Sequence, residues 1–373
     1  MRADTAISNA PNDLYGPDTR YHATLRSALT LTSKGPRLPF MNAPAASLAE
    51  LGWKPFFSTQ LSAAEVQSCR PVRVMAVHRG EIVVAGADIA CQMTSRLPHS
   101  AGEEDRPTVG DWLLIERDRL EPVRVLDRAS LFKRRAPGGD HRLQLVAANV
   151  DTVFIVASCN QDFSVPRLER YLVLAREVGV RPVVVLTKID LAENPEHFAQ
   201  EARSLQPGLA VELVNALDRD DTARLASHCA PGETVALLGS SGVGKSTLVN
   251  TLRGSDSIAT QAVREHDGKG RHTTTSREMH RLTHGGWLLD TPGMREFQVV
   301  DATDGLADVF DDFATLALSC RFTNCAHTTE PGCAVQAAMK TGALTPDRLE
   351  RWRKLTAEDE ANTTALARRR KRT

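Results

Sequence analysis

A glycine-rich segment constrains the fold of this chain more than any other feature. Residues 239–246 read Gly-Ser-Ser-Gly-Val-Gly-Lys-Ser and fit the pattern G-x-x-x-x-G-K-[ST]. An apolar run at 235–238 precedes the segment, and helical spacing follows at 247–252. Because a loop between a buried strand and a helix can turn its backbone N–H groups around phosphates, the pattern predicts a nucleoside triphosphate site. A chance glycine-rich turn is the alternative, and it would require pattern and context to coincide.

The loop predicts specific contacts but leaves the base open. Lys245 is expected to reach the β- and γ-phosphates, and the Ser246 hydroxyl is expected to bind Mg²⁺. The other candidate nucleotide-binding residues of this segment are Gly239, Ser240, Ser241, Gly242, Val243, Gly244 and Thr247.

Continuous apolar runs and helical segments alternate around the loop. The runs lie at 152–157, 183–186, 211–214 and 234–238, and helical spacing appears at 166–178. Alternation of this kind predicts an α/β domain with a parallel sheet and helices on both faces. Its ligand site is expected beyond the carboxyl ends of the strands.

Four residues after the run at 183–186 indicate the base. The Asp190 carboxylate can accept from guanine N1–H and N2–H₂, donors that adenine does not present together, and the Lys188 stem can cover the ring. This resembles the N/T-K-x-D element of GTPases, with Thr187 in place of the commoner Asn. Asn215-Ala216-Leu217 resembles the S-A-x element that contacts guanine O6, with Asn215 in place of the usual Ser.

Two further segments resemble the switch regions of GTPases. Asp290-Thr291-Pro292-Gly293 resembles D-x-x-G, in which Asp290 reaches Mg²⁺ through water and the Gly293 N–H faces the γ-phosphate. Thr274 or Thr275 is expected to supply the switch I hydroxyl to Mg²⁺, and the sequence does not choose between them.

The hydrolytic group is less clear. Met294 stands where Ras-like enzymes place a water-orienting Gln, and a thioether cannot orient water. Slow intrinsic hydrolysis, accelerated by a partner, is therefore expected. His272 is the candidate catalytic residue, although a solvent-exposed loop histidine explains it equally well.

The order of these elements is permuted. Asp190 precedes Lys245, whereas ordinary GTPases have the phosphate loop first. Both elements still belong at one edge of one sheet, so rejoining the chain elsewhere on the surface preserves the site. Switch II then leads directly into the C-terminal region, and we expect residues 294–300 to transmit the nucleotide state to it.

Regions on either side of the α/β pattern have their own signatures. Short strands at 72–77, 81–86, 111–116 and 122–126 predict a small antiparallel barrel. An OB-type barrel fits that size, and a generic small β-module fits the same pattern. Residues 1–45 are expected to form a mobile extension, and residues 133–135 lead into an expected linker at 136–139. A helix is expected at 346–366, followed by a basic tail that either contacts phosphate backbones or is simply solvated.

Three cysteines and one histidine cluster near the C-terminus, at Cys320, Cys325, His327 and Cys333. A closed Cys₃His set predicts one structural Zn²⁺, since no position remains for a catalytic water. Free cysteines beside a surface histidine are the alternative. The chain has 7 cysteines, and the scatter of the other four argues for a reducing compartment without disulfides.

Charge and hydropathy narrow the classes of function. Lys plus Arg and Asp plus Glu both number 46, so a nucleic-acid partner would need local basic patches. We expect neither a secretory signal nor a membrane span.

Together these segments resemble the ribosome small-subunit-dependent GTPase A family of circularly permuted GTPases. The resemblance is carried by residues 127–134, 147–151, 168–172, 187–190, 239–247, 272–275, 290–293 and the cysteine cluster. It implies an extension at 1–67, partly disordered, an OB-fold at 68–135, a permuted GTPase domain at 140–300 and a zinc-binding helical domain with a basic tail at 301–373.

The resemblance also implies a function. It implies binding to the 30S subunit late in its maturation, contact with 16S rRNA, and GTP hydrolysis with Mg²⁺ stimulated by that subunit. We expect a cytoplasmic monomer without a membrane partner. Two alternatives stay open: a metabolic P-loop ATPase or kinase, and a GTP-dependent switch that acts on a protein.

Overall fold

The computed structural model describes residues 46–98, 102, 104–135, 143–254, 277–290 and 302–370. All of them belong to one compact unit that spans 43–373. Several predictions lie outside the described residues: the extension at 1–45, His272, Thr274, Thr275, Thr291, Gly293 and the segment 294–300.

A mainly parallel sheet forms the centre of the α/β region. Its strand order is β10 (Ala210–Leu213), β9 (Arg181–Thr187), β8 (Thr152–Ser158), β11 (Thr234–Leu238), β13 (Trp287–Asp290) and β12 (Arg277–Arg281). Only β12 runs antiparallel to its neighbours. All seven residues of β8 are buried, as expected of a strand covered on both faces.

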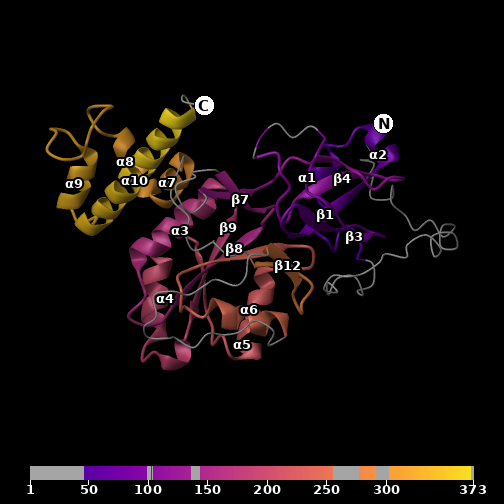
Figure 1. The fold of residues 1–373 in the computed structure, drawn as a ribbon. Coiled ribbons are helices and arrows are strands. Elements are labelled where there is room, and N and C mark those ends of the chain that lie inside the picture. The colour runs from indigo at the N-terminus through magenta and orange to yellow at the C-terminus, as the bar shows by residue number, and fades with distance from the viewer. Residues whose placement is uncertain are drawn as a thin grey trace, which may run out of the picture. The chain divides into compact units, whose positions relative to one another are not determined.

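Helices cover both faces of this sheet (Figure 1). On one face, Phe154 and Val235 pack with Leu248 of α6 (Lys245–Arg253) and Leu225 of the 3₁₀ helix η3 (Arg224–His228), next to α5 (Arg219–Ala223). Because side chains alternate along a strand, Ile155 and Val184 face the other way. There β8 and β9 contact α3 (Val165–Glu177), and β9 and β10 contact α4 (Pro195–Arg203).

The predicted small β-module is present and continues the central sheet. Its strands are β1 (Cys69–Val77), β2 (Glu81–Ala85), β3 (Ala90–Thr94), β4 (Trp112–Glu116) and β5 (Pro122–Val125). All their pairings are antiparallel: β1 with β2 and β4, β2 with β3, and β4 with β5. β1 also pairs with β12, so that among the described residues a single sheet has 11 strands.

Part of the predicted 1–67 extension is folded onto this module. From residue 46 the chain forms α1 (Pro55–Ser58) and α2 (Ala63–Ser68). Trp53 meets Trp112 edge-on with ring centroids 4.8 Å apart, and Phe57 is buried. Residues 46–67 therefore belong to the β-module, because their aromatic side chains complete its packing.

A separate two-stranded sheet flanks the predicted linker in the sequence. It pairs β6 (Leu131–Arg135) with β7 (Leu143–Ala148) in antiparallel orientation. The predicted linker itself, residues 136–139, lies outside the described residues.

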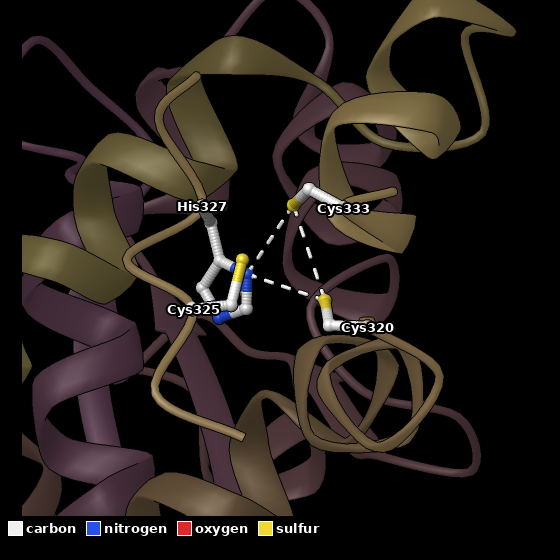
Figure 2. Close-up of side chains that lie close together, drawn as sticks. All are labelled: Cys320, Cys325, His327 and Cys333. Atoms are coloured by element: carbon white, nitrogen blue, oxygen red, sulfur yellow. Dashed lines mark hydrogen bonds between the residues drawn. The ribbon is translucent and has the colours of Figure 1, made fainter. Parts of the chain in front are cut away.

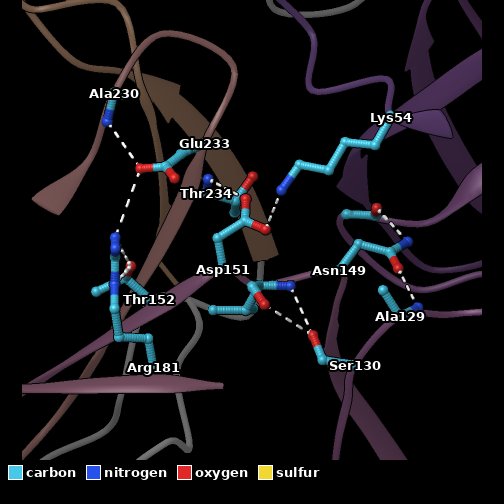
Figure 3. A network of polar contacts seen from close by, with 12 residues as sticks. Lys54, Ala129, Ser130, Asn149, Asp151, Thr152, Arg181, Ala230, Glu233 and Thr234 are labelled. Atoms are coloured by element: carbon cyan, nitrogen blue, oxygen red, sulfur yellow. Dashed lines mark hydrogen bonds and ion pairs between the residues drawn. The ribbon is translucent and has the colours of Figure 1, made fainter. Parts of the chain in front are cut away.

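A polar network joins the β-module to the α/β region (Figure 3). Asp151, just before β8, forms an ion pair with Lys54 and accepts from the Thr234 N–H at 2.9 Å. Nearby, the Arg73 side chain of β1 is 1 % exposed and donates to the Thr234 hydroxyl at 2.8 Å and to the carbonyls of Leu51, Gly110 and Asn149. The network lies where β8 and β11 begin, opposite the edge at which a nucleotide is expected.

The C-terminal region contains α7 (Thr303–Val309), α8 (Asp311–Leu318), α9 (Ala334–Lys340) and α10 (Pro346–Arg370). Two of these helices, α7 and α10, contact α3. A Cβ at Gly305 would lie 2.2 Å from the Val173 carbonyl oxygen, so only glycine allows α7 to approach this closely. The fully buried Glu169 of α3 accepts from Arg348 at 3.3 Å and Arg351 at 2.7 Å. In the described part of the chain, no helix is both long and apolar enough to cross a bilayer.

Candidate functional site

The phosphate loop has the local geometry that its sequence predicts. It connects β11 to α6, and Gly239 is placed so that a Cβ would lie 2.4 Å from the Val156 carbonyl oxygen. Lys245 Nζ donates to the Gly239 carbonyl at 2.6 Å and to that of Ser240. The ammonium group is therefore held against the loop at the N-terminus of α6, where a helix favours an anion.

One hydrogen bond joins the two motifs that are far apart in the chain. The buried Thr187 hydroxyl lies 2.6 Å from the Val243 carbonyl oxygen of the phosphate loop and 3.2 Å from that of Ala157. Thr187 thus ties the end of β9 to the phosphate loop. The structure brings the Thr-Lys-Ile-Asp segment and Lys245 to one edge of one sheet.

The backbone after Thr187 turns at once and exposes the acidic side chain. Lys188 has a left-handed conformation with φ 58°, and it leads into the 3₁₀ helix η2 (Ile189–Leu191). Asp190 is exposed in this short helix. A free carboxylate at this position can accept hydrogen bonds from a base that approaches the edge of the sheet.

The next loop shows why Asn can stand at position 215. Its Oδ1 accepts from the Leu217 N–H at 3.1 Å, which tightens the turn after β10. Its own N–H donates to Asp221 at 3.0 Å, and this backbone hydrogen bond lowers the pKa of that carboxyl. Thr251 of α6 donates to the Ala216 carbonyl at 2.7 Å, so the phosphate-loop helix also holds this loop.

Asp221 and Thr251 are positioning residues that the sequence analysis missed. Neither belongs to a nucleotide motif, and both act through contacts with the loop at 215–217. No local pattern could identify them, because each contact depends on how α5 and α6 lie beside β10.

Asp290 reaches the same edge from a third strand. It is the last residue of β13, which runs parallel to β11 with Leu289 opposite Ala236. The carboxyl end of β13 therefore lies beside the end of β11, from which the phosphate loop begins. Its partners in the predicted Mg²⁺ site, Thr274, Thr275 and Gly293, lie outside the described residues, as does His272.

The Cys₃His residues converge as a compact cluster (Figure 2). Their ligand atoms all lie within 4.8 Å of one another. His327 Nδ1 is 3.6 Å from Cys320 Sγ and 3.5 Å from Cys333 Sγ, and the two sulfur atoms are 3.9 Å apart. With bonds of about 2.3 Å to sulfur and about 2.0 Å to nitrogen, tetrahedral Zn²⁺ has edges of about 3.8 Å and about 3.5 Å. The cluster fits that ion.

Surrounding groups hold the cluster in place. The His327 carbonyl accepts from Gln336 at 2.6 Å and from Arg353 at 2.8 Å. The His327 ring lies edge-on to Trp352 with centroids 5.8 Å apart, and Trp352 stacks on Phe313. Helices α8, α9 and α10 are therefore all tied to the cluster.

Comparison with known proteins identifies relatives of the whole arrangement. A family model described as RsgA GTPase matches residues 125–300. Small ribosomal subunit biogenesis GTPase RsgA of Mesorhizobium japonicum is 48% identical over 331 residues, which cover 88% of this chain and 94% of that protein. Small ribosomal subunit biogenesis GTPase RsgA 2 of Vibrio parahaemolyticus is 48% identical over 323 residues, covering 87% and 88%.

Two solved structures share the fold. YjeQ from Thermotoga maritima matches with a TM-score of 0.58 and 24% identity, covering 78% of this chain and 98% of that one. YloQ, a circularly permuted GTPase, matches with a TM-score of 0.57 and 23% identity, covering 79% and 96%. The likeness indicates that the sheet and its permuted strand order form a circularly permuted GTPase fold.

Proposed function

The chain belongs to the RsgA GTPase family and is a GTP hydrolase, and from that premise we propose that it acts in late maturation of the 30S ribosomal subunit. We further propose that it binds 16S rRNA and that the subunit stimulates hydrolysis. The observation that carries the ribosomal proposal is the 48% identity to a small ribosomal subunit biogenesis GTPase over 88% of this chain. The Thr187–Val243 hydrogen bond supports the nucleotide site, because it joins the base-specifying segment to the phosphate loop. We also propose a cytoplasmic location, which the similarity to small-subunit biogenesis GTPases supports.

The proposed GTP site runs along the carboxyl edge of the sheet. Asp190, Lys188 and Thr187 form its guanine end, and residues 239–247 form its phosphate end. Asp290 and Gly293 complete it. Ser246, with Thr274 or Thr275, would hold the Mg²⁺ that accompanies GTP.

The flanking regions have distinct proposed roles. The pairing of β1 with both β2 and β4, and of β5 with β4, supports an OB-fold that presents RNA-binding loops. One Zn²⁺ would be held by Cys320, Cys325, His327 and Cys333. Its four bonds would stabilise a segment whose hydrophobic core is small. We place the start of the β-module at residue 46, and keep the GTPase domain at 140–300 and the zinc domain at 301–373.

GTPase rates with and without purified 30S subunits test the proposal. We expect a low intrinsic rate that rises on addition of subunits and falls back when they are treated with RNase. Stimulation that survives RNase but needs a ribosomal protein would favour a switch acting on proteins. No stimulation at all would refute the ribosomal role.

Base selection is tested separately with Asp190→Asn. Losing a charged hydrogen-bond acceptor should weaken GTP binding about 10- to 100-fold and remove the preference over ATP. Asp162→Asn, which changes another exposed carboxylate after a neighbouring strand, is the control. Equal affinity of the wild-type protein for ATP and GTP would favour a metabolic ATPase or kinase instead.

The role of His272 is also a proposal. We propose that it positions the hydrolytic water, since Met294 cannot. Unchanged subunit-stimulated turnover in His272→Ala would reject this role.

A further inference from the structure

The loop between the first two cysteines of the cluster exposes an unusual set of side chains. Arg321, Phe322, Thr323 and Asn324 are all exposed. Phe322 is 42 % exposed, and it is one of only five large hydrophobic residues in the described ranges that stand out to solvent. Cys320 and Cys325 hold the two ends of the loop at the cluster. The ring is thus presented on a short, anchored loop rather than on a free end.

The guanidinium beside the ring is available to an anion. Arg321 lies over the Phe322 ring, 5.5 Å from its centroid. Among the described residues, no carboxylate forms an ion pair with Arg321. Glu330, the acidic residue of the same segment, accepts instead from the backbone N–H groups of Ala326, Thr328 and Thr329 at 2.9, 2.7 and 3.0 Å.

We propose that this loop binds one unpaired nucleotide of RNA. The base stacks on the Phe322 ring, Arg321 pairs with the adjoining phosphate, and Thr323 and Asn324 offer hydrogen-bonding groups to the base edge. An apolar protein hot spot fits less well, since polar and charged side chains border the ring on both sides in the sequence. The inference rests on the proposed function only for the source of the RNA, the small subunit.

The full-length, zinc-loaded protein and a short single-stranded RNA containing 2-aminopurine provide the test. Stacking on the ring should quench the fluorescence of that base. Phe322→Ala should abolish the quenching and weaken binding of the oligonucleotide about 5- to 150-fold. Phe322→Trp should retain both, and Phe322→Leu should behave like the alanine variant. Arg321→Gln should flatten the salt dependence of binding.

Two controls separate stacking from misfolding. Phe198→Ala removes a half-buried ring from α4, which belongs neither to the β-module nor to the zinc domain, and should leave RNA binding unchanged. Zinc content and unstimulated GTP hydrolysis should equal those of wild type in every variant. If Phe322→Ala lost zinc, the test would rest on Phe322→Leu and Phe322→Trp instead. The tryptophan variant must then bind and quench the oligonucleotide more strongly than the leucine variant.

Defined outcomes overturn the proposal. Wild-type quenching and affinity in Phe322→Ala would do so, as would equal behaviour of Phe322→Leu and Phe322→Trp. Weaker 30S binding without any change in oligonucleotide binding would assign the loop to a ribosomal protein. If wild-type protein bound the oligonucleotide through Phe322 but 30S subunits did not stimulate hydrolysis, only the proposed function would fail.

Discussion

At the scale of single residues, Thr187 performs a task that its neighbours cannot. Its hydroxyl connects β9 to the carbonyl of Val243, and Gly244 leaves room for it, with a Cβ there only 3.4 Å from Thr187 Oγ1. The commoner Asn at this position would offer an N–H donor for the same purpose. Thr187 therefore makes the same link between β9 and the phosphate loop with a shorter side chain.

Thr187→Val should weaken GDP binding by about 1–2 kcal/mol, close to tenfold, because it leaves a buried carbonyl without its donor. Thr187→Ser keeps the hydroxyl and should bind nearly as wild type. Isothermal titration with GDP provides the measurement. Equal affinities in all three proteins would show that the hydrogen bond does not organise the site.

Arg73 is the residue on which the joint between the β-module and the α/β region depends. Burial lowers its pKa to about 10, and Asp151 and Asp111 oppose that effect. At neutral pH Arg73 therefore remains a buried cation. It donates hydrogen bonds to three carbonyl groups and to the Thr234 hydroxyl.

Arg73→Met should destabilise the protein by about 3–5 kcal/mol, since it leaves four buried hydrogen-bond acceptors without their charged donor. Arg70→Met on the same strand, whose side chain reaches the exposed Asp88 at 3.4 Å, should cost less than about 1 kcal/mol. Urea denaturation of both variants makes the comparison. Similar losses in the two would contradict a special role for Arg73.

At the scale of elements, α2 shows how a short helix is fixed to the β-module. Ser62 and Glu65 form a capping box, and Glu65 also accepts from Arg124 of β5 at 2.7 Å. The hydrogen bond from Arg124, with those from Ser62, lowers the pKa of Glu65 to about 2. A folded-state pKa below the unfolded value means that this stability is complete above about pH 4.5 and is lost as pH falls towards 2.

Glu65→Gln should therefore lower the melting temperature at pH 7, by an amount equivalent to about 1–2 kcal/mol, and less at pH 3.5. Asp88→Asn, which removes a weaker exposed ion pair, serves as the control and should show little difference between the two pH values. If Glu65→Gln lowered the melting temperature by the same amount at both pH values, the charge of Glu65 would not contribute to stability.

The pairing of β12 with β1 also joins the α/β region to the β-module. Arg277, the first residue of β12, lies opposite Val77 and donates to the Leu145 carbonyl of β7 at 2.6 Å. The first described strand after the predicted switch I threonines thus pairs directly with a strand of the β-module.

At the scale of the whole molecule, the C-terminal region is attached in two independent ways. α7 and α10 pack on α3 through Gly305 and the buried Glu169, whereas α9 depends on the cysteine cluster. The proposed zinc site should therefore stabilise only the part that lacks contacts with α3.

Removing the metal with a chelator, or replacing Cys325 with Ser, should melt the loop at 320–333 and α9. α7 and α10 should stay protected, and GDP affinity should stay the same, because the nucleotide site lies on other elements. Hydrogen exchange measured with and without metal, with Cys91→Ser as the control, makes the test. Release of nucleotide on chelation would show that the two sites are coupled.

The sequence was enough to predict the nucleotide-binding motifs and the cysteine cluster, since each depends on residue types at short spacing. The permuted order follows from the positions of these motifs along the chain. The parallel strands were predictable for the same reason, because long apolar runs mark strands buried on both faces. Weakly patterned elements such as β3, where intermediate and exposed residues alternate, were not.

Only the tertiary structure decided the contacts between distant segments. Thr187 meets Val243, Arg73 meets Thr234, and β12 meets β1 because of how the strands are ordered in the sheet. The same holds for the pairing of β6 with β7, two strands that come from either side of the predicted linker. Local spacing determines which face of an element is apolar, but it carries no information about which partner will cover that face.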